Sequence, residues 1–123
     1  MTYLYPDWDF YLETHKRILD EFGGYNGVLR FSREAFEGIM NEVKKVDGLY
    51  LQAAVLLNRL RSIRLVEDAQ KRTAYIITAA FLEKNGGAIF EKDIRNTDIF
   101  MKQDILRYNT EQIAEWLKNG KIK

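Results

Sequence analysis

Cysteine is absent from this 123-residue chain, and proline and histidine each occur only once. Without cysteine the chain can form neither a disulfide nor a thiolate metal site, and it has no cysteine nucleophile. The single proline and the few turn clusters argue against an all-β fold. No apolar run is long enough to span a membrane, and the first residues lack the pattern of a secretory signal. We therefore expect a cytoplasmic protein with no membrane partner.

An excess of either charge is also missing. Lysine and arginine total 19 against 18 acidic residues, which gives a formal net charge of +1. Domains that bind nucleic acids usually carry a basic excess, so this balance argues against a nucleic-acid partner. Apolar residues, in contrast, make up 46% of the chain. That is enough for one compact core, and we expect residues 1–123 to form a single domain.

Apolar residues recur at helical spacing in several segments of the chain. The expected helices cover residues 6–22, 32–43, 49–63, 74–82, 94–108 and 109–117. The run 74–82 is apolar nearly all round, which is typical of a central, buried helix. Ser32 is a candidate N-cap, and Asn109 with Gln112 has the spacing of a capping box. Short connections between these segments predict an all-α fold, a bundle of five to six helices with at most a small β-hairpin.

The only histidine, His15, lies on the apolar face of the first expected helix. A lone histidine in such a helix is more often a packed, hydrogen-bonded residue than a catalyst. We therefore interpret His15 as structural.

A polar turn at residues 64–73 leads directly into the most apolar helix. Arg59, Arg61 and Arg64 lie at the end of one expected helix, and Lys71 and Arg72 lie in the turn just before the next. The first backbone N–H groups of a helix lack intrahelical partners, and the helix dipole adds positive potential there. We therefore expect a phosphate-binding site at this point. The alternative is a solvated basic face that neutralises nearby acids.

Asp68, which lies in the same turn, has two possible roles. It could cap the helix that follows, or it could bind a metal ion that accompanies the phosphate.

The residues of this turn and the helices beside it follow a known pattern. They read Leu56-Leu57-x-x-Leu60-x-x-x-Arg64-x-Val66-x-Asp68-Ala69-Gln70-Lys71-Arg72-Thr73-Ala74, with Leu82-Glu83-Lys84-Asn85-Gly86 at the end of the apolar helix. This segment resembles the signature of the Fic/Doc (Fido) family, in particular its death-on-curing (Doc) branch. The family has His where this chain has Arg64, Phe where it has Val66, and Asn where it has Gln70.

The resemblance implies a helical bundle and a transferase. In that family the His accepts the proton of a target hydroxyl, which then attacks a phosphorus atom of a bound nucleotide. Most Fic proteins transfer AMP, whereas the Doc branch moves the terminal phosphate of ATP to a translation elongation factor. Doc proteins are toxins that a small antitoxin restrains. The resemblance thus implies a target protein, such as a translation factor, and an antitoxin as partners.

The same resemblance assigns a role to each residue of the turn. Asp68 would be the Mg²⁺ ligand. Ala69, Gln70, Lys71 and Arg72 would bind ATP or another nucleotide, with Lys71 and Arg72 holding its phosphates. Arg64 stands at the position of the catalytic His.

Arg64 leaves the function open between three hypotheses, because a guanidinium stays protonated and cannot serve as a base. Loss of a general base typically lowers the rate by about 10²- to 10⁴-fold. The first hypothesis is a weakened Doc-like transferase, since positioning and electrostatics carry much of phosphoryl transfer. The second is an inactive Fic/Doc-like module that binds a nucleotide, an anion or a protein partner. The third is a helical adaptor whose basic patch binds an acidic protein or RNA.

Overall fold

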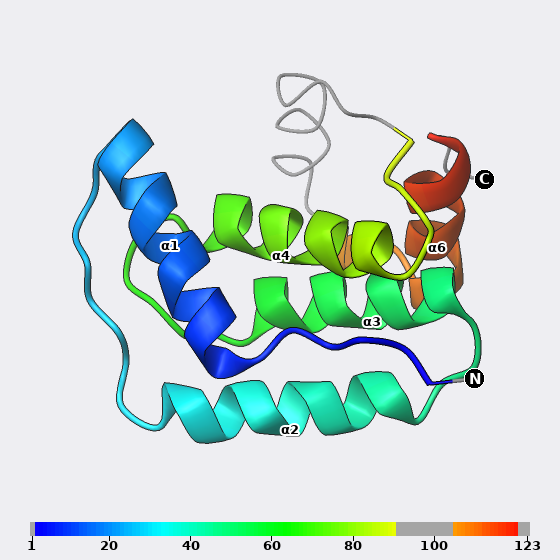
Figure 1. The fold of residues 1–123 in the computed structure, drawn as a ribbon, viewed down its shortest axis with the longest axis horizontal. Coiled ribbons are helices and arrows are strands. Elements are labelled where there is room, and N and C mark those ends of the chain that lie inside the picture. The colour runs from blue at the N-terminus through cyan, green and yellow to red at the C-terminus, as the bar shows by residue number, and fades with distance from the viewer. Residues whose placement is uncertain (1, 91–104, 121–123) are drawn as a thin grey trace.

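Five α-helices and one short 3₁₀ helix form the part of the chain that the computed structural model describes, residues 2–90 and 105–120 (Figure 1). They are α1 (Trp8–Phe22), α2 (Ser32–Lys44), α3 (Leu49–Ser62), α4 (Gln70–Lys84), η1 (Ile105–Arg107) and α6 (Thr110–Asn119). The expected all-α fold is confirmed. Over the described ranges β pairing is limited to one antiparallel bridge, between Val28 and Val66, where we had allowed for a hairpin.

Helix α3 lies at the centre of the bundle. It packs against α2, α4 and α6, and Figure 1 shows α2, α3 and α4 stacked side by side with α1 slanting across one end. Seven of its residues are buried, among them Ala53, Ala54, Leu56 and Leu57. The expectation that 74–82 would be the central helix is only partly right. Its helix, α4, is largely buried, but Ile76 is 36% exposed.

The N-terminal segment packs on the bundle instead of pairing as a strand. The rings of Tyr3 and Tyr5 contact the ring of Phe81 on α4, with centroids 6.4 and 5.5 Å apart. The Asn85 side chain accepts a hydrogen bond from the Leu4 N–H and donates one to the Leu4 carbonyl. These contacts hold the chain in place before α1 begins.

Side-chain caps start two of the helices. The Asp7 carboxylate accepts a hydrogen bond from the Phe10 N–H at 2.8 Å, and Asn109 forms the expected capping box with Gln112. Ser32 is not an N-cap, which corrects our expectation. Phe31 takes that position with φ 64°, and the Ser32 hydroxyl donates to the Leu65 carbonyl at 2.7 Å. The hydroxyl is thus used to tie α2 to the turn before α4.

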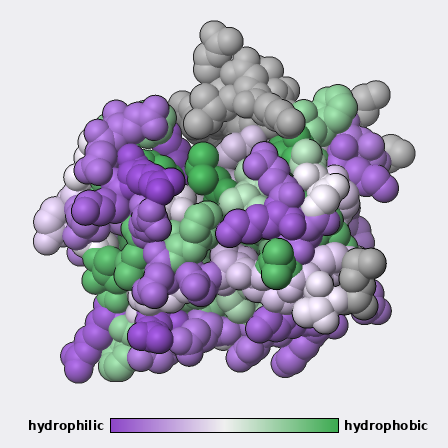
Figure 2. Space-filling view, in the orientation of Figure 1, coloured by the Kyte–Doolittle hydropathy of each residue, from purple (hydrophilic) through white to green (hydrophobic). Residues whose placement is uncertain are grey.

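The expected helix over 94–108 falls mainly outside the described residues, and its last part, Ile105–Arg107, is a 3₁₀ helix. Within the described ranges, no helix has the length and apolar character needed to cross a membrane. Figure 2 shows hydrophilic side chains spread over the viewed face of the molecule, with apolar side chains scattered between them.

The capping box gives a prediction for stability. We expect Asn109→Ala to lower the free energy of unfolding by about 1 kcal/mol, because the first turn of α6 loses the acceptor for the Gln112 N–H. Urea denaturation followed by circular dichroism measures this change. Asn109→Ser, which keeps a capping oxygen, should recover most of the loss, and equal losses in both variants would contradict the explanation.

Candidate anion-binding site

The six residues that the sequence assigned to the site line one hollow of about 480 Å³. We call it the α4 hollow, because it opens at the first turn of that helix. Its lining residues are Arg61, Ser62, Arg64, Val66, Glu67, Asp68, Ala69, Gln70, Lys71 and Arg72. The end of α3, the turn 63–69 and the start of α4 supply them, so the hollow is built from one continuous stretch of chain.

The backbone at the start of α4 is suited to an anion. Its N-cap, Ala69, has φ 64° and ψ 22°, in the left-handed region, and no side chain caps the helix. The first donor to find an intrahelical partner is the Thr73 N–H, which bonds the Ala69 carbonyl at 3.0 Å, and the Thr73 hydroxyl donates to the same oxygen at 2.7 Å. The N–H groups of residues 70–72 precede it and belong to the set that commonly binds anions.

The charge of the α4 hollow is positive. Arg61, Arg64, Lys71 and Arg72 supply four cations, and Glu67 and Asp68 supply two carboxylates, a net charge of +2. Lys71 is exposed and makes no hydrogen bond or ion pair with a described residue. Four cations around one hollow favour a ligand with several negative charges.

The other basic residues of this region are partly engaged. Arg64 donates to the Glu67 carbonyl at 3.0 Å, which holds it along the turn. Arg72 lies over the ring of Phe22, 4.2 Å from its centroid. Arg59, which the sequence placed with this cluster, does not line the hollow; its side chain forms an ion pair with Glu42 of α2 at 2.5 Å.

Asp68 does not cap α4, so that alternative is wrong. Its Oδ2 accepts a hydrogen bond from the Tyr25 N–H at 2.8 Å and thereby ties the α1–α2 connection to the turn. Its other carboxylate oxygen makes no hydrogen bond with a residue of the described ranges. No group of three or more His, Asp or Glu side chains that could hold a metal ion occurs in the described segments. A Mg²⁺ ion fits Asp68 only if phosphates and water supply its remaining ligands, as is common for this ion.

The Gln70 side chain faces the protein instead of solvent. Its Nε2 donates to the carbonyls of Leu60 and Ile63, at 2.9 and 2.8 Å, and its Oε1 accepts from the Leu65 N–H at 2.9 Å. Both amide donors are therefore used in joining the end of α3 to the start of α4. The group of Gln70 that could contact a ligand is its backbone N–H.

His15 is fully buried and hydrogen-bonded, so the structural interpretation is confirmed. Its Nε2 lies 2.8 Å from the carbonyl oxygen of Asp68. Since a carbonyl oxygen only accepts, Nε2 must be the protonated nitrogen of the ring. This bond connects the middle of α1 to the turn that carries the candidate site.

One segment that supports the turn of the site without lining the hollow was missed in the sequence, namely the connection 23–31 between α1 and α2. It runs beside the turn through two backbone hydrogen bonds, from Leu29 N to Leu65 O and from Glu67 N to Gly27 O, both 2.9 Å. Gly24 approaches so closely that a β-carbon there would lie 3.3 Å from the Asp68 Cβ. The glycine pair at 23 and 24, just after the expected helix 6–22, was the available signal in the sequence.

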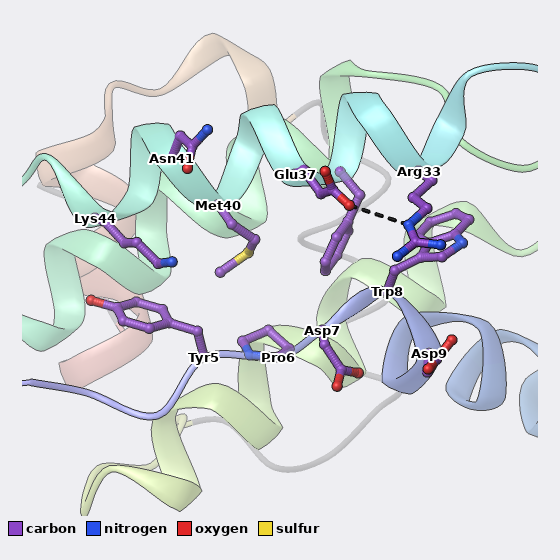
Figure 3. A pocket seen from close by; sticks show the side chains of 11 residues that line it. Tyr5, Pro6, Asp7, Trp8, Asp9, Arg33, Glu37, Met40, Asn41 and Lys44 are labelled. Atoms are coloured by element: carbon purple, nitrogen blue, oxygen red, sulfur yellow. Dashed lines mark hydrogen bonds and ion pairs between the residues drawn. The ribbon is translucent and has the colours of Figure 1, made fainter.

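A second hollow of about 450 Å³ lies between residues 5–9 and α2, and we call it the α2 groove (Figure 3). Figure 3 shows Lys44 and Asn41 toward one end, and Arg33, Trp8 and Asp9 toward the other. Arg33 pairs with Glu37 at 3.2 Å, and Asp7 caps α1. Because these charged groups already serve the fold, the α4 hollow is the stronger candidate for a ligand site.

The comparisons with known proteins add no assignment to this geometry: no protein-family model matches the chain, and none of the curated proteins matches it.

Proposed function

We propose that the α4 hollow binds the phosphates of a nucleotide, and that the protein is a Doc-like transferase weakened by Arg64. It would move a phosphate or AMP from ATP to a hydroxyl of a target protein in the cytoplasm. One observation carries the proposal. All six residues that the Fic/Doc resemblance assigns line a single, positively charged hollow at a helix start that no side chain caps.

In this proposal the phosphates lie at the first turn of α4. The N–H groups of residues 70–72, the Lys71 ammonium and the edge of the Arg72 guanidinium bind their oxygens. Asp68 is the residue that would hold Mg²⁺, which when bound neutralises part of the phosphate charge.

The transfer itself follows from these positions. The target's hydroxyl oxygen forms a bond to a phosphorus atom while the bond from that phosphorus to its leaving group, ADP or pyrophosphate, breaks. The hydroxyl proton passes to water, because Arg64 cannot accept it.

The alternative function is an inactive module that binds a nucleotide, an anion or a protein partner. Arg64 favours it, because this residue adds a cation to the hollow in place of a base. A stronger hold on the bound nucleotide would not by itself raise turnover. A small antitoxin and a target such as a translation factor are partners that only the family resemblance implies.

A label-transfer experiment tests the proposal. The protein, Mg²⁺ and ATP labelled in either the α- or the γ-phosphate are incubated with a lysate of the source cells. Label from the γ position on a discrete protein band indicates phosphate transfer, and label from the α position indicates AMP transfer. Lys71→Ala should abolish the signal. Lys45→Ala, an exposed lysine at the end of α2, serves as the matched control and should leave the signal unchanged.

Arg64→His separates the two functions. If the natural protein is weakened only by its missing base, this variant should raise the transfer rate by about 10²- to 10⁴-fold. If the natural protein transfers no label but ATP raises its melting temperature, the inactive binding module is supported. No transfer by either protein, together with no shift of the melting temperature by ATP, would contradict both functions and leave the helical adaptor.

A further inference from the structure

An aromatic side chain stands exposed beside the α4 hollow. Phe22, the last residue of α1, is 47% exposed. The Arg72 guanidinium lies over its ring, 4.2 Å from the centroid, and Arg72 also lines the α4 hollow. One side chain thus belongs both to the hollow and to a stack with an aromatic ring. We call this pair the Phe22–Arg72 stack.

The residues that follow Phe22 differ in their surroundings. Gly23 faces open space, whereas Gly24 and Tyr25 are held against the turn that carries Asp68. At Gly23, next to Phe22, an added β-carbon would meet no heavy atom within 4 Å. At Gly24, in contrast, it would meet Leu19 at 2.8 Å and Asp68 at 3.3 Å. The Tyr25 N–H is bonded to the Asp68 carboxylate. The end of α1 is therefore held against the turn that carries Asp68, while the Phe22 side chain remains 47% exposed.

We propose that the Phe22–Arg72 stack is the platform for the base of a nucleotide whose phosphates occupy the α4 hollow. This inference rests on the proposed function. A planar guanidinium can donate hydrogen bonds from its edge and stack through its faces. Phe22 covers one face of the Arg72 guanidinium, which is planar by its own delocalisation, so the base stacks on the other face. Arg72 touches the base, and Phe22 acts through Arg72 as a positioning residue.

The platform predicts a ligand class. Stacking on an aromatic or guanidinium surface does not depend on hydrogen-bonding edges, so the site does not distinguish adenine from guanine, whereas the larger purine rings stack more strongly than pyrimidine rings. The ligand is thus a purine nucleoside polyphosphate, with ATP and GTP bound similarly and CTP and UTP more weakly. An anion without a base should occupy the hollow but gain nothing from the stack.

Isothermal titration calorimetry with two probes, ATP and inorganic tripolyphosphate, each with Mg²⁺, tests the inference. Arg72→Lys keeps the charge but removes the planar group. It should weaken ATP binding by about 5- to 100-fold, the range measured for loss of one base stack. Phe22→Leu should weaken ATP binding in the same direction by a smaller factor. Tripolyphosphate binding should change less than twofold in Phe22→Leu.

Controls separate this inference from the proposed function. Phe90→Leu replaces another exposed phenylalanine, 65% exposed, which lies beyond the end of α4 where the Phe90 N–H bonds the Leu117 carbonyl of α6, and this variant should bind both probes as the natural protein does. Lys71→Ala should weaken both probes. Equal binding of both probes by the natural protein would contradict the proposal that the Phe22–Arg72 stack binds a base. Unchanged ATP binding by Phe22→Leu would contradict it too. Neither result would contradict a phosphate site in the α4 hollow. If neither probe binds the natural protein, the stack and the proposed function fail together.

Discussion

Gln70→Ala should lower the free energy of unfolding by about 3 kcal/mol, because it leaves several half-buried backbone groups without a hydrogen bond. The Gln70 amide serves the carbonyls of Leu60 and Ile63 and the N–H of Leu65, all within 2.9 Å. These groups belong to the last turn of α3 and the residues just after it, where the helix itself offers no partner. Alanine can replace none of the three bonds.

Urea denaturation monitored by circular dichroism measures the effect. Lys71→Ala is the matched control, since its side chain is exposed and makes no bond with a described residue. It should change the free energy of unfolding by less than about 0.5 kcal/mol, as exposed substitutions usually do. Gln70→Glu should lose at least as much stability as Gln70→Ala, because it keeps the acceptor for Leu65 but places a carboxylate oxygen against the carbonyl oxygens of Leu60 and Ile63. A loss below about 1 kcal/mol in Gln70→Ala would show that the three bonds contribute little.

Gln70 also shows which features of the candidate site could be predicted from the sequence and which could not. The motif assigned the residue to the candidate site, and the structure puts it in the lining of the α4 hollow. Its side chain points the other way, toward the end of α3. That direction depends on where two helices meet in space, and residue spacing along one chain does not contain this information. The same limit explains Arg59, which turns to Glu42 on a different helix.

Helix periodicity predicted the described elements well, because each helix buries an apolar stripe that repeats every three or four residues. It predicted the first turn of α4 less well. The apolar run was expected to start at Ala74, whereas α4 begins at Gln70, four residues earlier. Polar residues fill that first turn, so the hydrophobic pattern does not reveal it. The connection 23–31 has no period at all, and its position beside residues 65–67 could be found only in the fold.

Phe31 and Ser32 show a third limit, the competition between local and tertiary partners. Serine is a strong N-cap in isolation. Here its hydroxyl donates to the Leu65 carbonyl, 33 positions away along the chain, and Phe31 adopts the left-handed conformation instead. The local preference is overridden by a bond that joins α2 to the turn below the α4 hollow. Contacts of this kind gather around the turn 63–69, which is why the candidate site was the least predictable part of the fold.

His15→Ala should lower the free energy of unfolding by about 3 kcal/mol, through the loss of buried packing together with one hydrogen bond. His15 is completely buried on α1, and its Nε2 holds the Asp68 carbonyl at 2.8 Å. His15→Phe keeps an aromatic ring at the buried position and loses the hydrogen bond, together with the Nδ1 atom, which has no hydrogen-bond partner among the described residues, so it should cost about 1 to 2 kcal/mol. The difference in the free energy of unfolding between the two variants measures the packing contribution of the ring. The loss in His15→Phe reports the hydrogen bond to the Asp68 carbonyl.

Hydrogen exchange then decides whether His15 positions the candidate site or only stabilises the bundle. The amides of Tyr25 and Glu67 are bonded across the turn, to Asp68 Oδ2 and to the Gly27 carbonyl. In His15→Phe they should exchange faster than the loss of global stability explains, because the turn loses its anchor on α1. Ile18→Ala, a core variant on the same helix, serves as control and should speed exchange only by its global effect. Equal behaviour of the two variants would make His15 an ordinary core residue. Faster exchange confined to the Tyr25 and Glu67 amides would mean that His15 on α1 fixes the position of Asp68. The candidate site would then depend on a residue that contacts no ligand.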